Sequence, residues 1–159
     1  MEARSIDKKT FQLTENGQLL GELIYENLFF LKAEMKLRDS DLYGIKPVGI
    51  LGSSITVTKN GTEIATLQMN WRGQMVLTFH NGQEFILKAK GTFHNKYVIE
   101  NKNGENLLQL APKFSWRKFN YNYDITCDRQ PYDVLLILLG IYAANYSIAS
   151  MSGAIAGMA

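Results

Sequence analysis

The sequence is poor in the residues that carry metal and covalent chemistry. Its 159 residues include one cysteine and two histidines. A single cysteine excludes an internal disulfide, and no Cys-x-x-Cys or His-x-x-x-His spacing is present, so we expect no structural zinc site. The motifs Gly-x-Gly-x-x-Gly, the P-loop and Gly-x-Ser-x-Gly are absent as well. These absences predict a protein without a metal or cofactor.

Three residues remain as candidates for catalysis. Cys127 with His80 or His94 would supply the atoms of a nucleophile–base pair. The structural alternative is an inert thiol between the last strand and a following helix, with both histidines in or beside strands. We favour that alternative and expect no active site.

Charge is missing from the C-terminal part of the chain, where no side chain after Asp133 is charged. A helix that is apolar on every side is either enclosed in protein or set in lipid. Only Val134 to Ala144 is strongly apolar, which is the length of a core helix rather than of a membrane span. Arg129 is the only cation nearby, so the flanking cations of a membrane span are also missing. We predict an enclosed helix over about 131–149 and keep a C-terminal membrane anchor as the alternative.

The predicted helix begins with Pro131, which suits the first turn of a helix because its missing N–H is no loss there. The residues expected to form its buried faces are Leu135, Leu136, Leu138, Leu139 and Tyr142. Residues 150–159 are expected to form a disordered tail. The N-terminal MEARSIDKK lacks the apolar run of a signal peptide, so we expect a cytoplasmic protein. It would be membrane-associated if it binds lipid or has a C-terminal anchor.

The rest of the chain has the pattern of short antiparallel strands. Asn-Gly pairs at 16–17, 60–61, 81–82 and 103–104 lie between apolar-rich runs, as expected for type I′ hairpin turns. The runs alternate with period two, and no proline interrupts them between Pro47 and Pro112. We count about 11–12 strands over about 10–126, including one from Ser115 to Thr126.

A meander of that many strands leaves an interior too wide for its own side chains when it closes. An 11-stranded barrel with a central helix is a known solution. The strands need an element that occupies the barrel interior, and the apolar helix needs a surrounding wall that shields it from water. We therefore predict a mainly β fold, in which residues 1–159 form a single domain with a closed antiparallel barrel around the C-terminal helix.

Positive charge is concentrated in the middle of the chain. Residues 42–123 hold ten Lys/Arg against four Asp/Glu, a balance of +6, whereas the flanking segments are negative. Lys113 to Tyr123 interleaves three cations with five aromatic residues, a pattern that suits either a lipid headgroup layer or a barrel core with cations at its edge. The candidate contacts with an anionic surface are Lys88, Lys90, Lys113, Arg117 and Lys118.

Two stretches near the C-terminus carry a resemblance to a known family. Tyr123-Asp-Ile-Thr at the last strand and Tyr132-Asp-Val-Leu-Leu-Ile-Leu-Leu at the start of the helix resemble the tubby C-terminal-like superfamily, in its LURP-one-related and phospholipid-scramblase-like branch. The resemblance implies a barrel with a buried helix, and a partner class of phosphoinositides or membranes. No lipid-binding motif of the family is recognisable in the chain, so no binding residue is carried over.

Two classes of function follow from these observations. The first is a non-catalytic binding or scaffold module that meets an anionic phospholipid surface or a protein partner. The second is an enzyme with a pocket in the mouth of the barrel; a tail-anchored membrane protein of scramblase-like type is a further alternative. Nucleic acid is not expected as a partner, because a balance of +6 is mild for that role.

Overall fold

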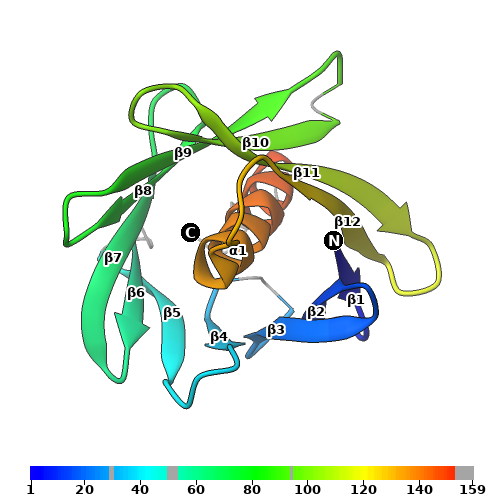
Figure 1. Ribbon diagram of the computed structural model, residues 1–159. Coiled ribbons are helices and arrows are strands. Elements are labelled where there is room, and N and C mark those ends of the chain that lie inside the picture. Colours follow the sequence, from blue (N-terminus) through cyan, green and yellow to red (C-terminus); the bar gives the residue numbers. More distant parts are fainter. Residues whose placement is uncertain (29–30, 50–53, 94, 153–159) are drawn as a thin grey trace.

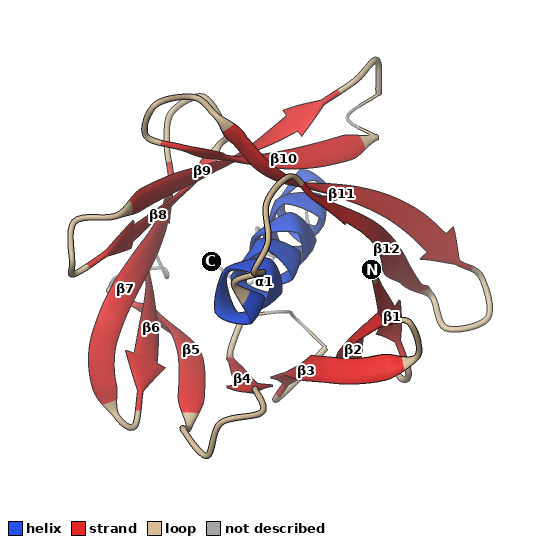
Figure 2. Cartoon of the chain, viewed as in Figure 1, coloured by secondary structure: helices blue, strands red, loops and turns tan. Residues whose placement is uncertain are grey.

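Twelve antiparallel strands follow one another around a closed barrel in chain order in the computed structural model, and the last strand pairs with the first (Figure 1). The structure describes residues 1–28, 31–49, 54–93 and 95–152. The elements are β1 (Glu2–Ser5), β2 (Thr10–Glu15), β3 (Gln18–Tyr25), β4 (Ala33–Lys36), β5 (Tyr43–Val48), β6 (Ser54–Lys59), β7 (Thr62–Met69), β8 (Met75–Phe79), β9 (Glu84–Lys90), β10 (Lys96–Asn101), β11 (Asn106–Ser115), β12 (Asn120–Cys127) and α1 (Val134–Met151). The predicted fold class is confirmed, and Figure 2 shows the helix surrounded by strands.

The hairpin turns form in two ways. Asn16 and Gly17 both have positive φ, as do Asn60 and Gly61, so these pairs adopt the predicted left-handed conformation at both positions. At 81–82 and 103–104 only the glycine has positive φ, which corrects the type I′ prediction there. In these longer turns Gly82 N–H donates to Phe79 O and Gly104 N–H to Asn101 O, both at 3.0 Å. A type I turn followed by a left-handed glycine has this pattern.

The helix begins later than predicted. Val134 is its first residue and Asp133 is its N-cap, with a carboxylate oxygen that accepts a hydrogen bond from Leu136 N–H at 3.1 Å. Pro131 therefore lies before the cap and not in the first turn. The acidic cap satisfies one of the free N–H groups at the helix start and complements its dipole. At the other end the helix continues to Met151, and residues 153–159 of the predicted tail lie outside the described residues.

The helix forms the centre of the core. Leu136, Leu138, Leu139 and Tyr142 are buried as predicted, but Leu135 is only half-buried because it lies in the first turn, near the rim of the barrel. Close approach to the wall depends on a small residue: a Cβ at Gly140 would lie 2.6 Å from the Cδ1 atom of Ile99. The apolar, uncharged character of the segment is therefore explained by contact with strands on all sides.

A polar network joins the helix to the wall inside this apolar core. Asn145 accepts a hydrogen bond from the Tyr123 hydroxyl at 2.7 Å and donates one to the Tyr25 hydroxyl at 3.1 Å. Tyr142 stacks on Tyr25 with 5.8 Å between the ring centroids, and its hydroxyl donates to Leu31 O at 2.5 Å. Because buried polar groups must find partners, these bonds favour one rotation and one depth of the helix in the barrel.

Two features of the barrel wall differ from the sequence prediction. Strand β1 was not predicted; it has four residues, of which only Ala3 and Ser5 are buried, so it carries almost no period-two signal. The predicted strand from Ser115 to Thr126 is instead interrupted by a hairpin at 116–119. Its turn has a left-handed Phe119, with φ of 50°, whereas in several other turns a glycine has the positive φ.

Candidate functional site

An up-and-down barrel sorts its loops into two sets, because successive turns lie at opposite ends of the wall. One end holds the start of α1 and the loops 16–17, 37–42, 60–61, 80–83, 102–105 and 128–133. The other end, called the aromatic end below, holds the last turn of α1 and the described residues of the loops 6–9, 26–32, 49–53, 70–74, 91–95 and 116–119. The end that holds the start of α1 is called the opposite end.

Exposed apolar side chains are concentrated at the aromatic end. Of the eleven large hydrophobic side chains exposed among the described residues, only Leu19 and Leu42 lie at the opposite end. All five exposed aromatic side chains in the described part of the chain lie at the aromatic end: Trp71, Phe93, Phe114, Trp116 and Phe119. Phe93 is 90% and Trp71 88% exposed. Exposed apolar residues are therefore distributed unevenly between the two ends of the barrel.

Charge separates between the same two ends. The loops of the aromatic end contain six cations (Lys8, Lys9, Lys32, Arg72, Arg117 and Lys118) and two carboxylates (Asp7 and Glu26), a side-chain balance of +4. The loops of the opposite end contain three cations (Arg38, Lys102 and Arg129) and five carboxylates (Asp39, Asp41, Glu105, Asp128 and Asp133), a balance of −2. The molecule is therefore an electric dipole along the barrel axis, positive where the aromatic rings are.

The five cations predicted from the sequence lie in different environments. Lys88 and Lys90 both bind the buried carboxylate of Glu100, at 2.5 and 3.0 Å. These bonds, with Lys88 first, hold the pKa of Glu100 below its usual value. The two lysines therefore balance a charge in the wall. The predicted contacts that remain lie on β11 and in the turn between β11 and β12.

That hairpin carries the other three predicted cations. Lys113 forms an ion pair with Asp124, and the Lys118 ammonium group donates to the carbonyl oxygens of Ser5 and Ile6, both at 2.7 Å. Arg117 is exposed in the turn, without an ion-pair or hydrogen-bond partner among the described residues. Of the five, Arg117 is therefore the cation most available to an external anion.

The same hairpin presents a cluster of aromatic rings. Phe114 is its centre: the ring centroids of Trp116, Tyr121 and Phe119 lie 5.0, 5.3 and 6.5 Å from that of Phe114, all with edge-to-face geometry. Edge-to-face packing stabilises aromatic pairs, so the rings support one another although three of them are exposed. At 70–74 a similar motif is smaller, with the Arg72 guanidinium 4.8 Å from the centroid of the Trp71 ring.

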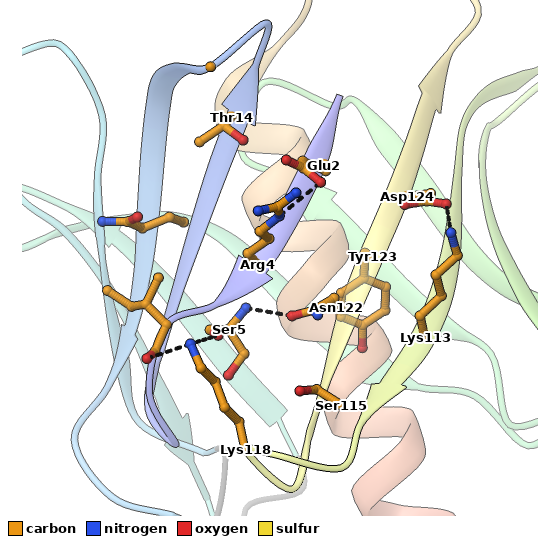
Figure 3. Close-up of a pocket in the computed structure, with 13 residues that line it drawn as sticks. Glu2, Arg4, Ser5, Thr14, Lys113, Ser115, Lys118, Asn122, Tyr123 and Asp124 are labelled. Atoms are coloured by element: carbon orange, nitrogen blue, oxygen red, sulfur yellow. Dashed lines mark hydrogen bonds and ion pairs between the residues drawn. The ribbon is translucent and has the colours of Figure 1, made fainter.

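A surface groove of about 690 Å³ follows the seam between β1 and β12 (Figure 3). Only Glu2 and Ala3 of β1 pair with β12. Beyond them the strands are joined by side chains, with Ser5 N–H donating to the Asn122 side-chain oxygen at 2.9 Å and Lys118 spanning the gap. The groove also contains Arg4, which binds Glu2 at 3.0 Å. The cations of the groove are thus bound within the protein. The side chains that line it join β1 to β12 and help to close the barrel.

The residues considered for catalysis do not form a reactive pair in the part of the chain that the structure describes. Cys127 is half-buried, and burial raises the pKa of its thiol, which favours the unreactive protonated form. His80 lies exposed at the opposite end with its Nε2 atom 2.9 Å from the Glu63 carboxylate. His94 lies outside the described residues. No group of three His, Cys, Asp or Glu side chains suited to a metal ion occurs among the residues described.

The helix is also the one element among the described residues that is long and apolar enough to cross a bilayer. That property follows from length and composition alone, and 67% of the segment is buried inside the protein. Core helices of globular proteins have the same composition when they are covered on all sides. Insertion of α1 in a membrane would require emptying the barrel and breaking the hydrogen bonds of Asn145.

No protein-family model, no curated protein and no solved structure matches this chain. The resemblance to the tubby C-terminal-like superfamily therefore stays a prediction.

Proposed function

We propose that this protein is a non-catalytic module that binds anionic membrane surfaces through the aromatic end of its barrel. The observation that carries the proposal is the coincidence of two properties at one end: the five exposed aromatic rings and the side-chain balance of +4. Amphipathic aromatic side chains favour the headgroup layer of a bilayer. Cations within a Debye length of an anionic leaflet each contribute about 1 kcal/mol.

The geometry supports shallow contact rather than insertion. The rings project from short loops attached to a closed wall, so they reach the headgroup layer while the barrel stays in water. The helix remains the core, and its hydrogen bonds through Asn145 stay intact. The opposite end, with its negative balance, would face away from an anionic surface. Charge therefore fixes orientation, and the aromatic rings add affinity that salt does not screen.

The test is sedimentation with vesicles of phosphatidylcholine alone and of phosphatidylcholine with phosphatidylserine, at low and at moderate salt. We expect binding to the anionic vesicles, weakened by salt, and little binding to the neutral ones. Binding that is equal for both vesicles would contradict the role of charge. Absence of binding to either would refute the proposal and leave a protein partner as the explanation of the aromatic end.

A variant with matched controls connects the binding to the aromatic end. Phe93→Ser, Trp116→Ser and Phe119→Ser together remove three exposed rings, each at least 73% accessible, without touching the core. We expect affinity for anionic vesicles to fall by at least about tenfold. Leu42→Ser is the control, because that side chain is 76% exposed at the opposite end and its loss leaves binding unchanged.

A further inference from the structure

A pocket of about 400 Å³ opens in the mouth of the barrel at the aromatic end, between the last turns of α1 and the strands β7 to β10. Pockets that hold small ligands have volumes of this order. Its wall includes Met69, Leu87, Ala89 and Met151. Met69 and Ala89 belong to the inward-facing rows of β7 and β9, yet both are exposed, which shows that the helix does not fill this side of the mouth.

Below the mouth the helix packs tightly against the wall on both sides, and a Cβ at Gly140 would lie 2.6 Å from Ile99 of β10. A Cβ at Gly21 of β3 would lie 3.1 Å from a methyl group of Leu138, so the helix is in tight contact on that side. Toward β7 to β10, a small apolar void of about 10 Å³ lies deeper between Gly140 and Leu87, which also lines the pocket. The mouth pocket is therefore confined to the end of the barrel, above a level of the core where only this small void remains.

The charged residues that line the pocket are both cationic. Arg72 and Lys88 line it and its lining contains no carboxylate, but Lys88 lies between the inward-facing Leu87 and Ala89, so its side chain points to the outer face of the wall. Lys88 is bound to Glu100, whereas Arg72 has no ion pair among the described residues and stacks on Trp71. The cationic group of this pocket that is available to a ligand is therefore Arg72.

Tyr97 supplies an unused hydrogen-bond donor in the same wall. Its side chain is buried, and its hydroxyl oxygen is the one buried side-chain polar atom without a partner in the described part of the chain. Burial raises the pKa of Tyr97 to about 12, so the phenol keeps its proton at neutral pH and can donate. A buried donor without an acceptor costs free energy. Flexible methionines at the mouth can move to admit the acceptor.

We infer that the mouth pocket binds an anionic amphiphile with a single alkyl chain, such as a fatty acid or an alkyl phosphate. The anion contacts Arg72, a ligand oxygen accepts the hydrogen bond of Tyr97, and the chain packs between Met69, Leu87, Ala89 and Met151. This binding does not depend on the proposed membrane contact, since a monomeric ligand in solution suffices.

The experiment uses decanoate, decyl phosphate and decanol, which share one chain length, below their micelle concentrations and with no vesicles present. Trp71 reports binding, because it stacks on Arg72 and is the only tryptophan left in Trp116→Phe. We expect both anions to change its emission and to bind, by calorimetry, about tenfold more tightly than decanol. A response to decyl phosphate alone identifies a phosphate site, and one to decanoate alone a carboxylate site. No binding of either anion, or binding no tighter than that of decanol, would overturn the inference.

Two substitutions separate a ligand site from a packing defect. Tyr97→Phe should raise the midpoint of thermal unfolding, since it removes the unpartnered hydroxyl, and yet weaken anion binding by about tenfold. Arg72→Gln should remove the preference for anions over decanol. Arg38→Gln at the opposite end is the matched control and should bind like the parent protein. If Tyr97→Phe and Arg72→Gln both fold and bind the anions unchanged, the pocket is not the site, whatever the outcome with vesicles.

Discussion

The two ends of the barrel have the same backbone architecture and opposite surface chemistry. Both consist of short hairpin loops, yet the described aromatic side chains that are exposed all lie at one end, with a balance of +4 against −2 at the other. Stability does not require this separation, because loop tips contribute little to the core. The comparison indicates that the wall and the helix determine the fold, whereas the exposed aromatic rings and the excess of positive charge belong to one set of loops.

The largest change in the free energy of unfolding is expected from a substitution in the core, which is common to both ends of the barrel. Leu138 is fully buried and touches the wall near Gly21. Leu138→Ala should lower the free energy of unfolding by about 2–5 kcal/mol, because it leaves a cavity between helix and wall. Urea denaturation measures the change. At a temperature where the variant is still folded, its affinity for anionic vesicles should equal that of the parent. A loss of affinity would show that packing of the core and binding at the aromatic end are coupled.

The next effect concerns charge and is measured in vesicle affinity. Lys8→Ala with Arg117→Ala removes two exposed cations from the aromatic end. At about 1 kcal/mol for each cation, affinity for anionic vesicles should fall roughly 30-fold at low salt. Lys36→Ala with Lys102→Ala removes the same charge from the other half of the barrel and should change affinity little. Equal losses in the two double variants would mean that net charge, and not its position, governs binding.

A smaller effect is expected from the polar network inside the core. Tyr123→Phe removes the hydroxyl that donates to Asn145 and leaves the amide oxygen without that donor. The free energy of unfolding should fall by about 1–3 kcal/mol. Thermal denaturation measures it, and near-ultraviolet circular dichroism reports whether the helix keeps its rotation. A stability equal to that of the parent would show that the network does not position the helix.

The smallest effect is a dependence of stability on pH. The pKa of Glu100 is lowered from its ordinary 4.5, chiefly by the hydrogen bond from Lys88. The stabilisation is complete above the pKa of the unfolded chain and is lost as the pH falls through the lower folded-state pKa. Glu100→Gln should therefore destabilise the protein at pH 7 and make its unfolding less sensitive to pH between about 5 and 3. Equal pH profiles for the two proteins would exclude this contribution.

The wall and the helix could be predicted from the sequence because each has a strong local signal. Period-two alternation marks most strands, Asn-Gly pairs mark turns, and the uncharged stretch after Asp133 marks the helix. The two features of the wall that were not predicted, β1 and the turn at 116–119, have weak signals. β1 has only two inward residues, and the turn at 116–119 lacks glycine and proline.

The candidate site was harder to predict because it depends on which loops share an end. The charge balance of 42–123 mixes loops of both ends with strand residues such as Lys88, whose partner Glu100 neutralises it. Counting hairpins assigns each loop to one end of the barrel, but residues 116–119 were predicted to lie inside a strand, so the aromatic cluster was not placed at a turn. The mouth pocket depends on the depth and tilt of the helix, for which the sequence has no signal.

The seam between β1 and β12 has a consequence for the order of folding. Ala3 pairs with Tyr123, so the barrel closes only when segments 120 residues apart in the chain have met. Such non-local pairing slows folding. Hairpins β2 to β11 can form early as local units, whereas closure waits for β12, and the helix that fills the interior comes later still in the chain. On a ribosome the protein would pass through an open, curved sheet with a bare apolar face, and chaperone contact would fall in that interval.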